Sequence, residues 1–160
     1  MSKEIERKFL LSSDSWRDAV VESNYMKQGY LAATGATVRV RVLQKEAFLT
    51  IKGKPTGLVR NEYEYPIPRE DAEEMLSSLA VYPPVEKFRH IIPAEDGLFW
   101  EVDEYLNANF PLFTAEIELP DTETSFALPD WVGEDISCDN RYTNRALSRK
   151  PYSLWSDEEK

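Results

Sequence analysis

The sequence has one cysteine and one histidine among its 160 residues. The single cysteine, Cys138, excludes a disulfide bond within the chain and fits a reducing compartment. Cys138 would need a base beside it to act as a nucleophile, and with a single histidine in the chain no obvious base is present. We therefore expect Cys138 to be structural and the protein to be cytoplasmic.

Long apolar segments are missing, and positive charge is in the minority. No apolar run approaches the length that crosses a bilayer, so we expect no membrane association. The polar start of the chain predicts no signal peptide. Twenty-nine acidic residues against nineteen basic ones give a net charge of −10. This excess argues against nucleic-acid binding through a broad basic surface, but it allows a basic pocket for a small anion.

The remaining composition is typical of one globular domain, which we expect to span residues 1–160, with 150–160 as a polar C-terminal tail. Strands are predicted at 3–11, 28–33, 37–43, 47–52, 62–67, 85–92, 98–105 and 113–119. Helices are predicted at 14–22 and 69–80, with shorter helical pieces near 122–128 and 139–149. Many antiparallel strands and few helices favour a barrel or a strongly curved sheet.

The most informative pattern is the spacing of charges in the predicted strands. Side chains alternate between the two faces of a strand, so Glu4, Glu6 and Lys8 share one face of the first. Like-charged pairs two residues apart recur in six further segments: Arg39 and Arg41, Lys52 and Lys54, Glu62 and Glu64, Lys87 and Arg89, Glu101 and Asp103, and Glu116 and Glu118. Like charges set side by side destabilise an ordinary sheet, so bound ions are expected to neutralise them.

Two arrangements fit this alternation. If the charged faces look outward, the apolar faces pack together as an ordinary sandwich, which is the commoner arrangement. If they look inward, the sheet encloses a charged tunnel whose apolar outer side is covered by helix 69–80 and by the rings of Trp16, Trp100, Trp131 and Trp155. The pattern alone favours the sandwich.

A series of short motifs favours the tunnel. They are Glu4-Ile5-Glu6-Arg7-Lys8, Gln28-Gly29-Tyr30-Leu31, Val38-Arg39-Val40-Arg41, Thr50-Ile51-Lys52, Glu62-Tyr63-Glu64, Val85-Glu86-Lys87-Phe88-Arg89, Glu101-Val102-Asp103, Ala115-Glu116-Ile117-Glu118 and Asp139-Asn140-Arg141-Tyr142. In order and spacing they resemble the CYTH superfamily, also called triphosphate tunnel metalloenzymes. The resemblance implies an α+β, mainly antiparallel fold: an eight-stranded closed β-barrel with flanking helices, whose charged lumen holds a triphosphate and a divalent metal.

The resemblance also implies roles for the charged residues. The candidate substrate-binding cations are Lys8, Arg39, Arg41, Lys52, Lys87 and Arg89, while Lys54 and Arg141 are left open between ligand contact and solvated charge. Glu4, Glu6 and Glu118 are the expected ligands of Mg²⁺ or Mn²⁺, with Glu116 supporting the same or a second ion. Glu62, Glu64, Glu101 and Asp103 are expected to pair with the cations, and direct ligation of the metal is the alternative.

Lys8 and Tyr30 are the expected catalytic residues. An ammonium beside Tyr30 would lower the pKa of the phenol, so that the phenolate could act as base. Two alternatives stay open: Tyr30 only packs or hydrogen-bonds, or a metal-bound hydroxide serves instead. His90 has the opposite parity from Lys87 and Arg89, so we expect it to point outward and not to be catalytic.

Small members of the family with this pattern look most like inorganic triphosphatases. The expected reaction is therefore the metal-dependent hydrolysis of inorganic triphosphate, a small molecule, to diphosphate and phosphate. Adenylyl cyclase, thiamine triphosphatase and a non-catalytic polyphosphate-binding module are the alternatives. A homodimer is compatible with the composition, and the C-terminal segment is expected either to plug one end of the lumen or to mediate contacts between protomers.

Overall fold

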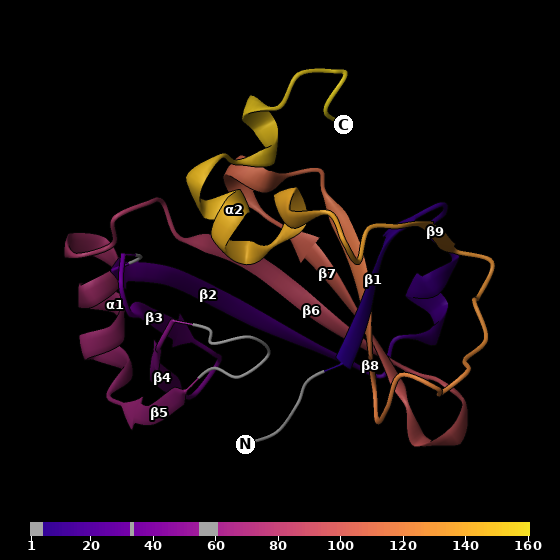
Figure 1. Ribbon diagram of the computed structural model, residues 1–160, viewed down its shortest axis with the longest axis horizontal. Coiled ribbons are helices and arrows are strands. Elements are labelled where there is room, and N and C mark those ends of the chain that lie inside the picture. The colour runs from indigo at the N-terminus through magenta and orange to yellow at the C-terminus, as the bar shows by residue number, and fades with distance from the viewer. Residues whose placement is uncertain (1–4, 33, 55–60) are drawn as a thin grey trace.

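The computed structural model of the protein describes residues 5–32, 34–54 and 61–160. Within these ranges a single antiparallel sheet has the strand order β5-β4-β3-β2-β6-β7-β8-β1-β9 (Figure 1). Its strands are β1 (Ile5–Leu11), β2 (Glu22–Ala32), β3 (Thr37–Val42), β4 (Ala47–Lys52), β5 (Glu62–Ile67), β6 (Val85–Pro93), β7 (Phe99–Tyr105), β8 (Phe113–Leu119) and β9 (Val132–Asp135). The helices are α1 (Arg69–Ser78) and α2 (Asn144–Arg149), with short 3-10 turns at Ser15–Ala19, Glu95–Gly97, Asn107–Asn109, Asn140–Tyr142 and Tyr152–Leu154.

The mainly antiparallel α+β class is confirmed, but the closed eight-stranded barrel is wrong. Among the described residues the sheet has nine strands, and its hydrogen-bonded order ends at β5 on one side and β9 on the other. The added strand, β9, pairs with the edge of β1 opposite β8, with Phe9 facing Asp135 and Leu11 facing Val132. A strand can pair along two edges only. Because β8 and β9 occupy both edges of β1, β1 cannot also pair with β5 there, and the barrel is not closed.

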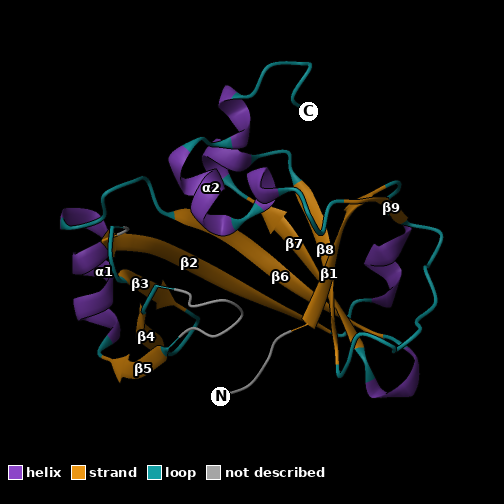
Figure 2. Cartoon of the chain, in the orientation of Figure 1, coloured by secondary structure: helices purple, strands orange, loops and turns teal. Residues whose placement is uncertain are grey.

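The ordinary sandwich is also wrong, because the apolar face of this one sheet packs against helices and irregular chain. α1 lies along the β2–β4 part of the sheet in Figure 1, and its Ala72 and Leu76 pack with Val40 and Val42. At the other end, Trp16, Trp100 and Trp131 belong to one buried cluster on β1, β6, β7 and β8. Figure 2 shows the helices arranged around the strands, with no second sheet among the described residues.

The predicted helix at 69–80 is present as α1. Its close packing against β2 depends on Gly29. A Cβ atom at Gly29 would lie 2.7 Å from Cδ2 of Leu76, closer than van der Waals contact allows. The acids Glu70 and Asp71 in its first turn interact favourably with the positive end of the helix dipole. The missing side chain at Gly29 therefore lets the helix lie directly on the sheet.

The C-terminal part of the chain is more ordered than a tail. The helical piece expected near 122–128 is absent from the described structure, whereas 139–149 forms a 3-10 turn and α2. Beyond α2, Pro151 and Trp155 are buried, and the Trp155 ring lies 5.0 Å from that of Tyr142. Residues 150–160 are polar in sequence, yet they add an aromatic anchor to a second core cluster.

None of the helices in the described ranges is long and apolar enough to span a bilayer.

Candidate functional site

The charged side chains meet in one polar cavity of about 340 Å³. Its charged lining consists of Glu6, Glu62, Glu64, Glu101, Glu116 and Glu118 with Lys8, Arg39, Arg41, Lys52 and Arg89. These residues come from β1 and β8 near one end of the sheet, from β6 and β7, and from β3, β4 and β5 at the other end. Strands so far apart in the hydrogen-bonded order can share a cavity only because the sheet curls and its charged face is concave.

The wall formed by β6 and β7 is a closed network of ion pairs around Asp103. Both Lys87 and Asp103 side chains are fully buried, with 2.8 Å between Lys87 Nζ and Asp103 Oδ2. Arg89 donates to both oxygens of the same carboxylate, from Nε at 2.8 Å and Nη2 at 2.9 Å. A third carboxylate contact joins Arg89 Nη1 to Glu101 at 2.7 Å. Every charge in this wall has a partner within the protein.

Titration within this network follows from burial and contact. Burial favours the neutral form of Asp103, but Lys87 and Arg89 outweigh it and hold the pKa of the carboxyl below its usual value. Burial lowers the pKa of Lys87 to about 8, although Asp103 opposes this shift. Burial also raises the pKa of Glu101, against the attraction of Arg89. These opposing effects are typical of ion pairs that are removed from solvent.

Lys8 is held next to this network by Glu116. The two residues face each other across β1 and β8, and Lys8 Nζ lies 3.1 Å from Glu116 Oε1. The same ammonium donates to the Tyr142 carbonyl at 3.1 Å. Glu116, which we expected to support a metal, therefore has an ion-pair partner of its own.

In the wall formed by β3, β4 and β5, the distances between cations and carboxylates are longer. Arg39 Nη2 is 4.0 Å from Glu64, and Lys52 Nζ is 3.9 Å from Glu62. Arg41 donates from Nε to the side-chain oxygen of Gln28 at 3.0 Å. Among the residues that the structure describes, no carboxylate oxygen lies within 4.0 Å of the Arg41 guanidinium.

Arg41 therefore carries a charge that the surrounding protein does not neutralise. Burial lowers the pKa of Arg41 to about 10, and repulsion from Arg39 and Arg89 adds to the shift. The neighbouring Arg39 has a buried Nε with no hydrogen-bond acceptor among the described residues. Two adjacent guanidinium groups thus face the cavity with unused capacity to bind an anion.

Carboxylates suited to a metal stand at the rim of the cavity. Glu6 and Glu118 face each other across β1 and β8, and both are exposed. Glu4, the third expected ligand, lies outside the described residues. Within the described part of the chain, no group of three or more His, Cys, Asp or Glu side chains is placed to share one ion. The pair Glu6 and Glu118 nevertheless offers hard oxygen donors that fit Mg²⁺ or Mn²⁺.

Tyr30 and Lys8 line different cavities in the described structure. Tyr30 lines a smaller cavity of about 100 Å³ with Thr37, Arg145, Arg39 and Lys52, and the last two also line the main cavity. Lys8 is on β1, and β6, β7 and β8 separate that strand from β2, which carries Tyr30. The pairing of Lys8 with Tyr30 therefore has no support from strand order, because β1 and β2 are not neighbours.

Three other residues considered as candidates from the sequence, Lys54, Arg141 and His90, do not line the main cavity. Lys54 is exposed at the end of a described segment. Arg141 is exposed too, and its side chain donates to the Asp139 carboxylate and to the Glu159 carbonyl. His90 is on the opposite face of the sheet, with Nδ1 2.7 Å from Ser23 Oγ.

The structure also shows site residues that the sequence did not single out. Gln28 is fully buried and orients Arg41. Thr143 and Asn144, at the start of α2, line the cavity, and Asn144 Oδ1 accepts from Tyr105 at 3.1 Å. Two signals could have assigned Gln28 to the site: it belongs to the motif Gln28-Gly29-Tyr30-Leu31, and it has the same parity as Tyr30 on β2. Nothing in the sequence places Asn144.

Comparisons with known proteins agree with this arrangement. Residues 2–147 match the CYTH domain, which confirms the resemblance seen in the motifs. An inorganic triphosphatase of Acetivibrio thermocellus is 44% identical over 98% of this chain and 100% of its own length. An inorganic triphosphatase of Nitrosomonas europaea is 35% identical over 91% of this chain and 96% of its own. A crystal structure of an inorganic triphosphatase superposes with a TM-score of 0.75 at 30% identity, covering 98% of this chain and 97% of the other.

Proposed function

The chain belongs to the CYTH domain family, and we propose from this premise that it hydrolyses inorganic triphosphate to diphosphate and phosphate. The activity named for the relatives supports the proposal. In the molecule itself, the observation that carries it is Arg41. A half-buried guanidinium beside a second one, with no carboxylate of a described residue within 4.0 Å, needs an anion to offset the repulsion.

The substrate would lie between the two walls of the cavity. Arg39 and Arg41 offer planar forks that can each hold two phosphate oxygens. Lys52 adds a compact charge on the same wall, while Lys8 and Arg89 face the substrate from the other side. Phosphoryl transfer depends mostly on such positioning and charge neutralisation. The five cations therefore form the proposed substrate clamp, and Lys87 supports it from behind, bound to Asp103.

The charge balance of the lining favours a metal-dependent reaction. Six carboxylates against five cations line the cavity, so a polyanion entering alone would meet repulsion at the rim. Glu6 and Glu118 are the residues that would hold Mg²⁺ or Mn²⁺, and Glu4, the third expected ligand, lies outside the described residues. When bound, such a metal neutralises phosphate oxygens and stabilises the charge that develops on them. We propose this dependence for the chain.

Other roles stay predictions. Tyr30 remains a candidate base, since its cavity shares Arg39 and Lys52 with the main one. Thr143 and Asn144 line the cavity, which supports the expectation that the C-terminal segment plugs the lumen. The single domain, the cytoplasmic location and the homodimer stay predictions as well.

A substrate panel tests the proposed reaction. The purified chain is incubated with Mg²⁺ or Mn²⁺ and with triphosphate, ATP or thiamine triphosphate, and the products are followed by ³¹P NMR. We expect triphosphate to turn over fastest and to give diphosphate and phosphate in equal amounts, and EDTA to stop the reaction.

The alternatives give different products. Cyclic AMP formed from ATP would identify a cyclase, and preferential turnover of thiamine triphosphate would identify that phosphatase. Tight triphosphate binding without phosphate release would identify a binding module. Each of these results would contradict the proposed reaction.

A further inference from the structure

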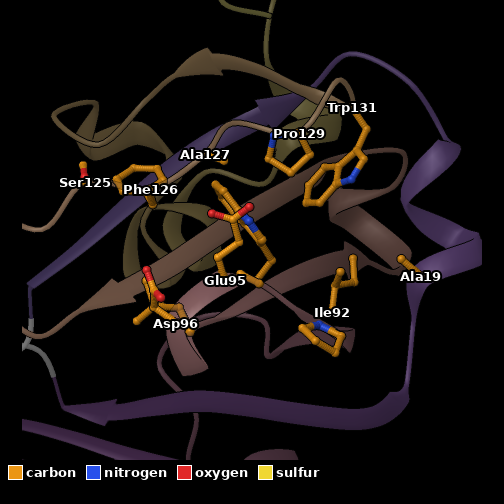
Figure 3. Close-up of a pocket in the computed structure, with 13 residues that line it drawn as sticks. Ala19, Ile92, Glu95, Asp96, Ser125, Phe126, Ala127, Pro129 and Trp131 are labelled. Atoms are coloured by element: carbon orange, nitrogen blue, oxygen red, sulfur yellow. The ribbon is translucent and has the colours of Figure 1, made fainter.

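The charged cavity differs from the cavity on the other side of the sheet in its unpaired polar atoms. That other cavity, of about 300 Å³, is lined mostly by the hairpin that joins β6 and β7 and by residues 125–131 (Figure 3). Among its described lining residues, no buried side-chain nitrogen or oxygen lacks a hydrogen-bond partner. At the charged cavity, in contrast, Nε of Arg39 is buried without an acceptor, and so is Nε2 of Gln28, the residue that contacts Arg41. Such atoms lower stability and call for an explanation.

The contact between Gln28 and Arg41 determines which atoms of both side chains remain available. The two residues face each other across β2 and β3. Gln28 is 1% exposed, and its Oε1 accepts from Nε of Arg41 at 3.0 Å. Because a guanidinium group only donates, this contact fixes which end of the amide is the oxygen. Nε2 of Gln28 is therefore the end without an acceptor in the described structure, and the contact leaves Nη1 and Nη2 of Arg41 for a ligand.

A purely structural role would favour an acid at position 28. A glutamate would bind the same guanidinium more strongly and would have no amide N–H left over. The same sheet contains such an arrangement, since the buried Asp103 binds Arg89 through both carboxylate oxygens. An acid would also offset the repulsion that Arg39 and Arg89 exert on Arg41. The amide of Gln28 therefore gives up stability, and what it preserves is the positive charge of Arg41.

We propose that Gln28 is a positioning residue whose neutrality keeps the charge of Arg41 available to the substrate. This role rests on the proposed function, because it concerns the contact that Arg41 makes with triphosphate. The amide oxygen holds Nε, so that Nη1 and Nη2 can meet two oxygens of one phosphate group. A carboxylate in the same place would hold the guanidinium equally well but would cancel most of its attraction for a polyanion.

The Gln28→Glu variant tests this role, because it changes the charge of the partner and almost nothing of its shape. Calorimetric titration with imidotriphosphate and Mg²⁺ measures the affinity without turnover, since the nitrogen bridges of this analogue resist hydrolysis. We expect Gln28→Glu to weaken binding about tenfold or more, because it offsets a charged contact. The urea midpoint of unfolding should stay the same or rise.

Gln44→Glu is the matched control. It makes the same chemical change in the exposed β3–β4 turn and should leave the affinity for imidotriphosphate unchanged. Unchanged affinity in Gln28→Glu, or equal weakening in both variants, would overturn the proposal.

A double-mutant cycle shows whether Gln28 acts through Arg41, and it does not depend on how well Gln28→Glu folds. Gln28→Met removes the hydrogen bond without adding charge and should weaken binding of imidotriphosphate about threefold to tenfold. In the Arg41→Met background the same change should have no further effect, because no guanidinium is left to position. Equal weakening in the two backgrounds would overturn the proposal.

Failure of the proposed reaction gives a different result. A chain that binds imidotriphosphate with this pattern of variants, but releases no phosphate from triphosphate, supports the role of Gln28 and contradicts hydrolysis. A chain that hydrolyses triphosphate with a KM that Gln28→Glu leaves unchanged contradicts the role of Gln28 alone.

Discussion

The two walls of the charged cavity carry the same kinds of side chain but hold them differently. On β6 and β7, Lys87 and Arg89 both contact Asp103 at 2.8 Å. On β3, Arg39 is 4.0 Å from Glu64, and Arg41 contacts the amide of Gln28 instead of an acid. The first wall is neutralised by the protein, whereas the second keeps positive charge available.

This difference separates support from binding among residues that look alike in sequence. A cation already bound to a buried carboxylate contributes little attraction to a ligand, because its field is largely cancelled. A cation without such a partner attracts an incoming anion with its full charge. We therefore interpret Lys87 as a positioning residue and Arg41 as the principal substrate contact, with Arg89 in both roles.

The largest effect should come from breaking the neutralised wall. Asp103→Ala leaves Lys87 buried without its partner, which costs about 3–5 kcal/mol in the free energy of unfolding. Asp135→Ala is the matched control, because it removes the acid of the exposed Arg7–Asp135 pair and should cost at most about 1 kcal/mol. Urea unfolding measures both. Similar losses in the two variants would show that the buried network is not the main support.

The next effect concerns the rim. Glu6→Gln together with Glu118→Gln removes the two exposed rim carboxylates and should lower kcat at saturating Mg²⁺ or Mn²⁺ at least about hundredfold, since metal ions contribute several kcal/mol to such reactions. Glu46→Gln with Glu123→Gln changes two exposed acids outside the cavity and should leave kcat unchanged. Steady-state phosphate release gives the comparison, and normal kcat in the rim variant would exclude the ligand role.

The third effect tests the open wall directly. Arg41→Met should weaken triphosphate binding about tenfold to hundredfold, the range for a hydrogen bond to a charged group. Its free energy of unfolding should not fall, because the change relieves repulsion from Arg39 and Arg89. Arg89→Met, in contrast, should lose both affinity and stability, since Asp103 loses a partner. Calorimetric titration measures the triphosphate affinity of each variant, and urea unfolding measures its stability. If Arg41→Met loses as much stability as Arg89→Met, the two walls do not differ in this way.

The smallest expected effect is on the free energy of unfolding at acid pH. The folded-state pKa of Asp103 lies below its usual value of 3.8, so this group contributes stability above that pH, and the contribution is lost as the pH falls through the folded-state value. The slope for one group is at most about 1.4 kcal/mol per pH unit. The stability difference between wild type and Asp103→Asn should therefore shrink below pH 3.8. A constant difference down to acid unfolding would contradict the lowered pKa.

Much of this site could be predicted because strand parity is a local property. Residues two apart share a face whatever the fold, so Arg39 with Arg41 and Glu116 with Glu118 could be grouped from the sequence alone. The apolar spacing of 69–80 predicted α1 in the same way. Parity does not tell which side chains on neighbouring strands face each other, and it therefore could not distinguish Lys87, bound to Asp103, from Arg41, bound to Gln28.

The parts that were missed depend on long-range contacts. β9 has four residues, including a glycine, and no alternation marks it as a strand. The first half of β2 is polar, with Glu22, Ser23 and Asn24, and becomes a strand through its pairing with β6. In each case tertiary pairing outweighs the local signal.

The pairing of β1 has a consequence for how the chain folds. Its partners in the sheet are β8 and β9, and Arg7 contacts Asp135 at a sequence separation of 128. Bringing such distant segments together carries a loop-closure cost, and topologies rich in these contacts fold slowly. During synthesis, Glu6 and Lys8 of β1 therefore stay exposed to solvent until the ribosome has released most of the described chain. An incomplete nascent chain lacks one side of the triphosphate site, so the polyanion can help to hold the protein together only at the last stage of folding.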